Sequence, residues 1–198
     1  MDLLLIDVPQ RVSTERFILR CPQPGDGAAI NAAICATLDD LRPWMPWAQA
    51  APLLDESEAY CRRSHAKFEL REDLPYFVFE REPDGSEGVL VGACGLHRID
   101  WAVRRFEIGY WRCAGLPGKG IATEAARALN RMAFDRLDAR RVEIRMDDSN
   151  APSRKVAERA GFTFEGLLRR DTLNVQGEPR STRVYSRVRG AEEPAAPA

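Results

Sequence analysis

The chain has 198 residues, of which 44% are hydrophobic and 30% are charged, and its formal net charge is −1. This length and composition are typical of a single soluble domain with a substantial core. The near-neutral charge provides no bulk attraction to nucleic acid or to an anionic membrane. No apolar run is long enough to cross a bilayer, and Met1–Asp7 lacks the basic start of a signal peptide, so we expect a cytoplasmic protein.

The cysteines and histidines do not form the pattern of a metal site. The five cysteines are scattered without a Cys-x-x-Cys pair, which predicts neither a zinc site nor a disulfide framework. The chain has only two histidines, His65 and His97. We therefore expect no metal.

The first 70 residues predict one strand and two helices. Residues 15–20 alternate as in a strand, and Asp26 is suited to cap a helix whose apolar residues recur at helical spacing from Ile30 to Leu38. Two prolines in residues 41–47 interrupt this pattern. A second helix is expected from Asp55 or Ser57 to Leu70.

The middle of the chain predicts an antiparallel meander. Three strands are expected without an intervening helix, at Tyr76–Glu82, Val89–His97 and Arg105–Trp111, with a turn at Asp84-Gly85. A helix from Ala122 to Leu137 then leads to a strand at Val142–Met146, which must run parallel to the strand before the helix if the two are neighbours.

The last elements complete one mixed α/β domain. A short helix is expected at Pro152–Ala160, closed by Gly161, and two strands are expected at Phe162–Arg169 and Arg183–Arg189 with a turn near Gly177. We expect a single domain over residues 1–190. Residues 191–198 are rich in Pro and Ala and predict a disordered tail.

The most informative segment is the strand Phe106–Trp111 followed by the glycine turn Gly118–Thr123 at the start of a helix. The first turn of a helix has N–H groups without partners and carries partial positive charge. Gly118 and Gly120 have no Cβ atoms that would keep an anion away. The segment therefore predicts a phosphate-binding site.

Two common phosphate-binding motifs do not fit this segment. A Walker A loop needs Ser or Thr after Gly-Lys, whereas Gly120 follows Lys119 here, and Cys113 occupies the place of its first glycine. A dinucleotide-binding fold is a closer rival, because Asp147-Asp148 ends the next strand where a ribose-binding acid would lie. Against it, Thr123 replaces the third glycine, and too little chain remains for a second βαβ half.

The glycine turn resembles the acetyl-CoA-binding core of the GCN5-related N-acetyltransferase (GNAT) superfamily. The signature of that superfamily is Gln/Arg-x-x-Gly-x-Gly/Ala, matched here by Gly120 and Ala122. The chain departs from it at Pro117, which replaces the first Gln or Arg. The resemblance implies an αβα layered fold with a mostly antiparallel sheet of about seven strands, in which one parallel pair splays apart for CoA.

Further segments resemble the RimJ/RimL-type ribosomal-protein N-acetyltransferases within this superfamily, in the same order and over roughly residues 13–189. These segments are Glu15–Arg20, Leu41–Trp47, Ile108–Trp111 and Asn150–Ser153 with Ala160–Phe162. The resemblance implies acetyl-CoA as co-substrate and no metal. The cofactor-binding residues that it implies are Ile108, Tyr110, Trp111, Gly118, Lys119, Gly120, Ile121, Ala122, Thr123, Asn150 and Ser153.

Three residues are candidates for proton transfer. Ser153 is the expected hydrogen-bond donor to the leaving thiolate, and Asn150 has the spacing of the N-cap of the same helix. Glu107 is the first candidate base, acting through water, although a salt-bridged strand glutamate is an equal interpretation. Glu80 is the second candidate, and we interpret His97 as a hydrogen-bonded structural histidine. A backbone N–H near Tyr110 or Trp111 is the expected oxyanion donor.

Three residues are expected at the acceptor: Trp44, Trp47 and Glu80. For the two tryptophans, this is what the resemblance implies. Core packing is the alternative interpretation of both tryptophans. We expect transfer of acetyl from acetyl-CoA to a primary amine by direct attack, with a protein N-terminal α-amine of the ribosomal type as the acceptor. A small-molecule amine acceptor (a polyamine, amino acid or aminoglycoside) and a non-catalytic acyl-CoA-binding domain remain alternatives. No direct nucleic-acid or membrane partner is expected, and a homodimer is a possible assembly.

Overall fold

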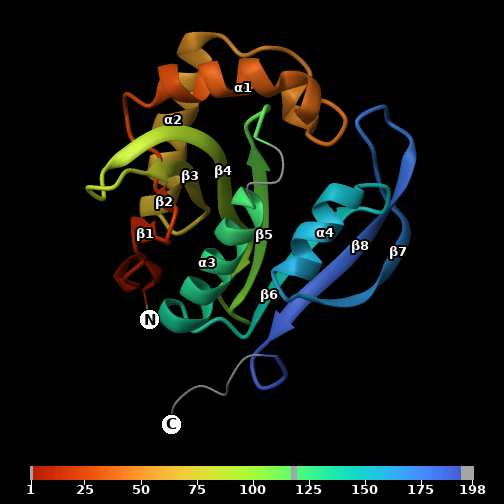
Figure 1. Ribbon diagram of the computed structural model, residues 1–198. Helices are drawn as coiled ribbons and strands as arrows, with labels where there is room; N and C mark the ends of the chain where they lie inside the picture. Colours follow the sequence, from red (N-terminus) through yellow and green to blue (C-terminus); the bar gives the residue numbers. More distant parts are fainter. Residues whose placement is uncertain (1, 117–119, 193–198) are drawn as a thin grey trace.

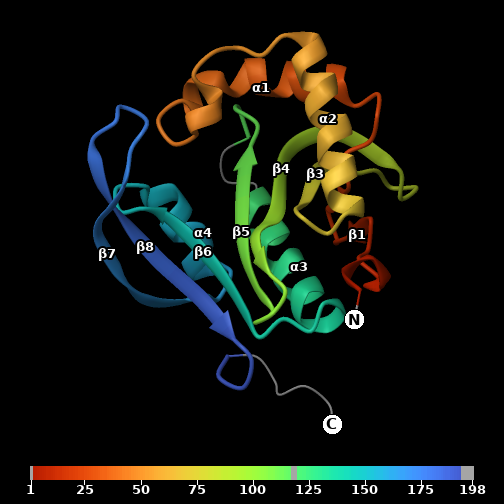
Figure 2. The same cartoon turned by 180° about the vertical axis from the view of Figure 1, so that it is seen from behind.

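The computed structural model describes residues 2–116 and 120–192, and their strands form one eight-stranded sheet (Figure 1). The strand order is β1-β2-β3-β4-β5-β6-β8-β7, and every neighbouring pair is antiparallel except β5 and β6. Helices α3 and α4 cover one face of the sheet and α1 and α2 cover the other, as Figures 1 and 2 show from opposite sides. The predicted mixed αβα architecture is confirmed.

The elements follow one another in the expected order. The strands are β1 (Arg11–Ser13), β2 (Phe17–Arg20), β3 (Leu74–Arg81), β4 (Glu87–Asp100), β5 (Arg105–Arg112), β6 (Arg141–Asp147), β7 (Thr163–Leu173) and β8 (Pro179–Val188). The helices are α1 (Gly27–Leu41), α2 (Leu54–Glu69), α3 (Ile121–Arg136) and α4 (Ala151–Arg159), with short 3-10 helices η1 (Leu3–Leu5) and η2 (Pro46–Ala48). The short strand β1 was not predicted. None of the described helices is long and apolar enough to cross a membrane.

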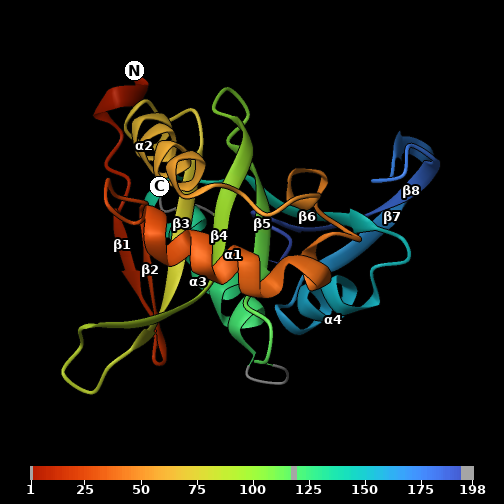
Figure 3. The same cartoon turned by 90° about the horizontal axis from the view of Figure 1, so that it is seen from above.

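The two faces of the sheet bury separate hydrophobic clusters. On one face, Ala125, Leu129 and Ala133 of α3 form an apolar stripe and pack with Phe106 and Ile108 of β5. On the other face, α1 buries its apolar positions against β3 and β4. The members of that second cluster include Ile30, Ile34, Leu38, Phe77, Phe79 and Leu90. Figure 3 shows α1 lying across the strands.

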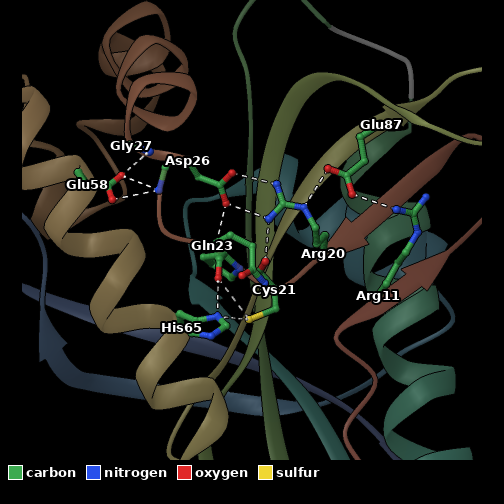
Figure 4. Close-up of polar contacts among 11 residues, drawn as sticks. Arg11, Arg20, Cys21, Gln23, Asp26, Gly27, Glu58, His65 and Glu87 are labelled. Atoms are coloured by element: carbon green, nitrogen blue, oxygen red, sulfur yellow. Dashed lines mark hydrogen bonds and ion pairs between the residues drawn. The ribbon is translucent and has the colours of Figure 1, made fainter.

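The start of α1 differs from the prediction that Asp26 caps it. Asp26 occupies the N-cap position, but its side chain accepts no capping hydrogen bond. Its carboxylate instead accepts from the guanidinium of Arg20 at 2.9 and 3.0 Å. The backbone N–H groups of Gly25 and Gly27 donate to the carboxylate of Glu58 on α2, as Figure 4 shows. A distant acid on α2 therefore replaces the local cap.

Two predicted glycine positions are confirmed in the second half of the chain. Gly161 follows α4 with a φ of +85°, the left-handed conformation expected after a helix end. Gly177 has a φ of +81° in the turn between β7 and β8. These turns bring β8 back beside β6, so that the long hairpin extends the sheet beyond α4.

Candidate active site

The parallel strands β5 and β6 separate after a short ladder. They pair only between residues 105–107 and 141–143. Strand β6 continues to pair with β8 as far as Asp147, whereas Ile108–Arg112 have no β6 partner in the described chain. Figure 1 shows the two strands diverging toward their carboxyl ends. This is the splayed parallel pair that the resemblance implies.

Backbone groups of β5 face this gap in alternation. Cys113 donates its N–H to the carbonyl of Val91 on β4 at 2.8 Å, and the β4–β5 register is unbroken from Arg112 back to Glu107. Amides on an antiparallel strand point alternately toward and away from the paired strand. The N–H groups of Tyr110 and Arg112 therefore point toward β6 and are available to a bound group. The N–H of Trp111 points toward β4, so Tyr110 is the better of the two predicted oxyanion donors.

The amino end of α3 lies where the glycine turn was predicted. Gly120 is the N-cap, with a φ of +70° in the left-handed region, and no side chain caps the helix. The first-turn amides of Ile121, Ala122 and Thr123 have the arrangement that binds an anion. A Cβ atom built on Gly120 would lie 3.4 Å from Nη2 of Arg16. The predicted ligands Gly118 and Lys119, and the substituted Pro117, lie outside the described residues.

Glu80 lies apart from the other predicted acceptor residues. It lines a cavity of about 360 Å³ with Glu15, Arg16, Phe17, Arg81 and Glu82, near the turn between β1 and β2. Arg16 connects this turn to the start of α3, because its Nε donates to Glu124 at 2.8 Å. Strand β4 separates β3 from β5, so the structure does not bring Glu80 together with Trp47 and Trp111.

Tyr110 and Ser153 join β5 to α4. The hydroxyl of Tyr110 lies 2.8 Å from Oγ of Ser153 and 3.2 Å from its carbonyl oxygen. Burial raises the pKa of Tyr110 to about 12, so the phenol stays protonated and remains a donor. Sequence reasoning selected Tyr110 for its backbone and missed this side-chain contact. The alternation of β5, which places Tyr110 on the face shared with Ile108, was the signal for it.

Asn150 caps α4 as predicted. Its Oδ1 accepts the backbone N–H of Ser153 at 3.0 Å, which fixes the first turn of the helix. This contact places the Ser153 hydroxyl beside Tyr110. The role of Asn150 in binding pantetheine stays a prediction.

Glu107 lies on the face of the sheet opposite Tyr110. Its carboxylate is 3.3 Å from Nη1 of Arg98 and is mostly buried. Burial raises its pKa, and the positive charges of Arg98 and Arg145 oppose that rise. The regular register places Glu107 on the same face of β5 as Gly109 and Trp111. The alternative interpretation of Glu107 was a salt-bridged glutamate, and the structure shows an ion pair with Arg98.

One predicted tryptophan contacts β5 on this same face. The ring centroids of Trp47 in η2 and Trp111 in β5 are 6.3 Å apart, and Trp47 is half exposed. Trp44, also in the segment between α1 and α2, is partly exposed. The two tryptophans are therefore not core residues of the second cluster, and Trp47 borders the α1–α2 side of β5.

His97 was interpreted as a hydrogen-bonded histidine, and the structure shows such a hydrogen bond. Its Nδ1 lies 2.7 Å from Oδ1 of Asp73. Sequence reasoning missed Asp73, which precedes β3 immediately. The pairing of Leu74 with Leu96 brings Asp73 beside His97. Among the described residues, no group of three or more His, Cys, Asp or Glu side chains is arranged to hold a metal.

Comparison with known proteins points to one family. Residues 16–163 match the acetyltransferase (GNAT) domain model. The chain is 43% identical over 100 residues to "Putative ribosomal N-acetyltransferase YdaF" of Bacillus subtilis (strain 168), covering 50% of this chain and 54% of that protein. It is 35% identical over 83 residues to the ribosomal-protein-serine acetyltransferase of Escherichia coli (strain K12), covering 42% and 46%.

A solved structure extends the likeness to nearly the whole chain. Mycobacterium smegmatis RimJ in complex with CoA-disulfide superposes with a TM-score of 0.75 at 26% identity, over 95% of this chain and 90% of that one. The matches to the first curated relatives span only about half of their length. The domain match, which covers most of the chain, together with the splayed β5–β6 pair and the glycine start of α3, shows that the chain belongs to the GNAT acetyltransferase family.

Proposed function

We propose that this protein is a cytoplasmic N-acetyltransferase that moves the acetyl group of acetyl-CoA to the α-amine of a protein N-terminus. The observation that carries the proposal is the gap between β5 and β6. One end of the gap has the uncapped start of α3 at Gly120, and its wall bears the paired hydroxyls of Tyr110 and Ser153. A long thioester with a pyrophosphate at one end matches these features.

The residues present fit acetyl-CoA. The first-turn amides of α3 would hold the pyrophosphate, and the gap-facing backbone of Tyr110 and Arg112 would pair with the pantetheine arm as an added strand does. When bound, acetyl-CoA supplies a thioester carbonyl that an amine can attack. The N–H of Tyr110, which points into the gap, would hold the carbonyl oxygen as it becomes negative.

Side chains on the two faces divide the proton transfers. Ser153, held by Asn150 and Tyr110, presents its hydroxyl on the α4 side and donates to the leaving sulfur. Glu107, on the opposite face, adds a carboxylate on the side from which the amine would approach. Proximity within the bound pair supplies a large part of the rate, since effective molarities can reach about 10⁵ M or more.

The acceptor enters from the α1–α2 face of β5. The other face of the strand is occupied by the buried cluster under α3, whereas Trp47 and Trp111 border the α1–α2 side. Relatives with names that refer to ribosomal proteins support a protein N-terminus as the acceptor. Trp44 and Trp47 are the residues that we assign to shaping its path.

Acetylation of an amine panel tests this proposal. The panel contains peptides with the N-terminal sequences of ribosomal proteins, the same peptides with blocked N-termini, a polyamine, a free amino acid and an aminoglycoside. We expect CoA release and acetylation with free N-terminal peptides, and none with the blocked ones. Faster transfer to the polyamine or another small amine would replace the proposed acceptor while retaining the reaction.

A ligand screen distinguishes a protein that binds CoA without catalysis from a protein that binds another class of ligand. Acetyl-CoA and CoA should raise the melting temperature, because they bind only the folded state. Stabilisation by CoA without transfer to any amine would indicate an acyl-CoA-binding domain. Stabilisation by NAD but not by CoA would contradict the proposal.

A further inference from the structure

The imidazole of His97 lies over two glycines of neighbouring strands. A Cβ atom built on Gly95 would lie 2.8 Å from Cε1 and Nε2 of the ring, and one built on Gly109 would lie 2.9 Å from Cδ2 and 3.2 Å from Nε2. Real Cβ atoms do not approach so closely, so any larger residue at either position would displace the ring. The paired glycines Gly95 on β4 and Gly109 on β5 thus leave the space that the imidazole occupies, which we call the seat of His97.

Asp73 fixes which nitrogen of His97 is free. Its carboxylate accepts a hydrogen bond from Nδ1–H at 2.7 Å. A proton on Nδ1 leaves Nε2 of the neutral ring as an acceptor. Nε2 makes no hydrogen bond within the part of the chain that the structure describes, and the side chain is 37% exposed. Sequence reasoning interpreted this histidine as structural, but its unengaged nitrogen and open edge are those of a base.

The ring lies close to the proposed reaction centre. It covers Gly109, which directly precedes Tyr110, whose N–H points toward the β5–β6 gap and would hold the thioester oxygen. Adjacent residues on a strand are about 3.3 Å apart along its axis. The ring lies on the α1–α2 face, where Glu107, Gly109 and Trp111 point and where the amine is proposed to enter.

Charged groups of the neighbouring elements surround His97. Asp73 lies before β3, and Glu107 is directly opposite on β5. Arg98 on β4 pairs with Glu107, and Arg145 and Glu143 on β6 act on Glu107 in opposite senses. Tyr60 of α2 is close enough to Asp73 to feel its charge. Two carboxylates thus flank the imidazole, and Arg98 offsets one of them.

We infer that His97 is the base that takes the proton from the acceptor amine, with Asp73 as its positioning residue; this rests on the proposed acetyl transfer. The amine nitrogen forms a C–N bond to the acetyl carbon as its proton passes to Nε2. The C–S bond breaks, and the sulfur leaves with the electron pair toward the Ser153 hydroxyl. The imidazolium then releases its proton to solvent, and Glu107 serves as its charged neighbour rather than as the first acceptor.

Histidine variants test the role of His97 directly. His97→Gln should lower kcat by about 10²-fold, the lower end of the range for general-base catalysis, and leave the affinity for acetyl-CoA unchanged. It should also remove the limb of the pH–rate profile that reports imidazole deprotonation. His65→Gln is the matched control, because His65 contacts Pro22 and Cys21 away from the site. Turnover of His97→Gln equal to that of the parent would overturn the inference.

Glycine variants test the seat without removing the histidine. Gly109→Ala should lower kcat because the new Cβ displaces the ring. Gly166→Ala on β7 is the control, since an added Cβ there meets nothing within 4 Å. Full activity in Gly109→Ala would contradict the placement of the reactive nitrogen.

Nuclear magnetic resonance of the ligand-free protein gives a readout that does not depend on activity. With only two histidines, the imidazole nitrogens are readily assigned by His65→Gln. We expect His97 to carry its proton on Nδ1, and Asp73→Asn to shift the proton toward Nε2. A proton on Nε2 in the parent would overturn the dyad. If the parent binds CoA but acetylates no amine, the proposed function fails, whereas unaltered transfer by His97→Gln refutes the base alone.

Discussion

At the scale of single residues, the contact between Ser153 and Tyr110 distinguishes one hydroxyl from the other polar groups near the gap. The two oxygens are 2.8 Å apart, and Tyr110 stays protonated because burial raises its pKa to about 12. A protonated phenol can donate to Oγ of Ser153, which would leave the serine proton for the leaving sulfur in the proposed reaction. The pair therefore acts as a unit.

Replacing Ser153 by Ala tests this unit. We expect kcat to fall by about tenfold or more, with a smaller change in acetyl-CoA affinity, because the hydroxyl acts on developing charge. Tyr110→Phe should lower kcat less, and the double variant should lose less than the sum of the two free-energy changes. Ser86→Ala, in the turn between β3 and β4, is the control. Equal kcat in Ser153→Ala and the parent, measured under saturation, would reject the role.

Single residues also show where sequence reasoning succeeds and where it stops. The roles of Asn150 and Gly161 at the two ends of α4 were predicted because their signals lie within one turn of the chain. Asp73 was missed because its contact with His97 depends on the pairing of β3 with β4. The prediction that Asp26 caps α1 was wrong for a related reason. The backbone N–H groups at the start of α1 donate to Glu58, which lies on another helix.

At the scale of elements, the start of α3 depends on a left-handed glycine. Gly120→Ala should lower the free energy of unfolding by about 1–2 kcal/mol, because a side chain in this region meets its own backbone. Gly177→Ala is a matched control, with a similar positive φ in the β7–β8 turn. Both should be destabilised in urea unfolding, but only Gly120→Ala should also bind CoA more weakly by calorimetry. Equal CoA affinity in the two variants would contradict the binding of the pyrophosphate at the start of α3.

The β7–β8 hairpin is attached to β6 through Glu165. Its carboxylate accepts from Arg141 at 2.6 and 2.5 Å and from Ser186 at 2.6 Å, which lowers its pKa to about 2. An unfolded Glu has a pKa of about 4.3. The contribution to stability is therefore complete above that value and is lost as the pH falls toward 2.

Glu165→Gln tests this attachment. The variant should be less stable than the parent near neutral pH, and the difference should shrink as the pH falls from about 4.3 toward 2, because the parent then loses its carboxylate. Urea unfolding at a series of pH values measures the difference. A difference that does not vary with pH would mean that the ion pair contributes nothing through its charge.

At the scale of the whole molecule, one interruption in the sheet organises the site. The β5–β6 pair is the single parallel step in the described sheet, and it opens after three residue pairs. The sequence predicted the parallel crossover because a helix lies between the two strands. Residue spacing did not predict where the pairing of β5 with β6 ends. Only the family resemblance implied that the two strands separate. Beyond that point β6 continues to pair with β8 alone, a long-range contact that residue spacing does not reveal.

Amide hydrogen exchange with and without acetyl-CoA tests the central claim most directly, because it reports which backbone groups the ligand covers. Binding in the β5–β6 gap should slow exchange at Tyr110 and Arg112 and in the first turn of α3, while Trp111, which points toward β4, should change least. Slowed exchange confined to other elements, or none at saturating acetyl-CoA, would contradict the assignment of this gap to the acetyl donor.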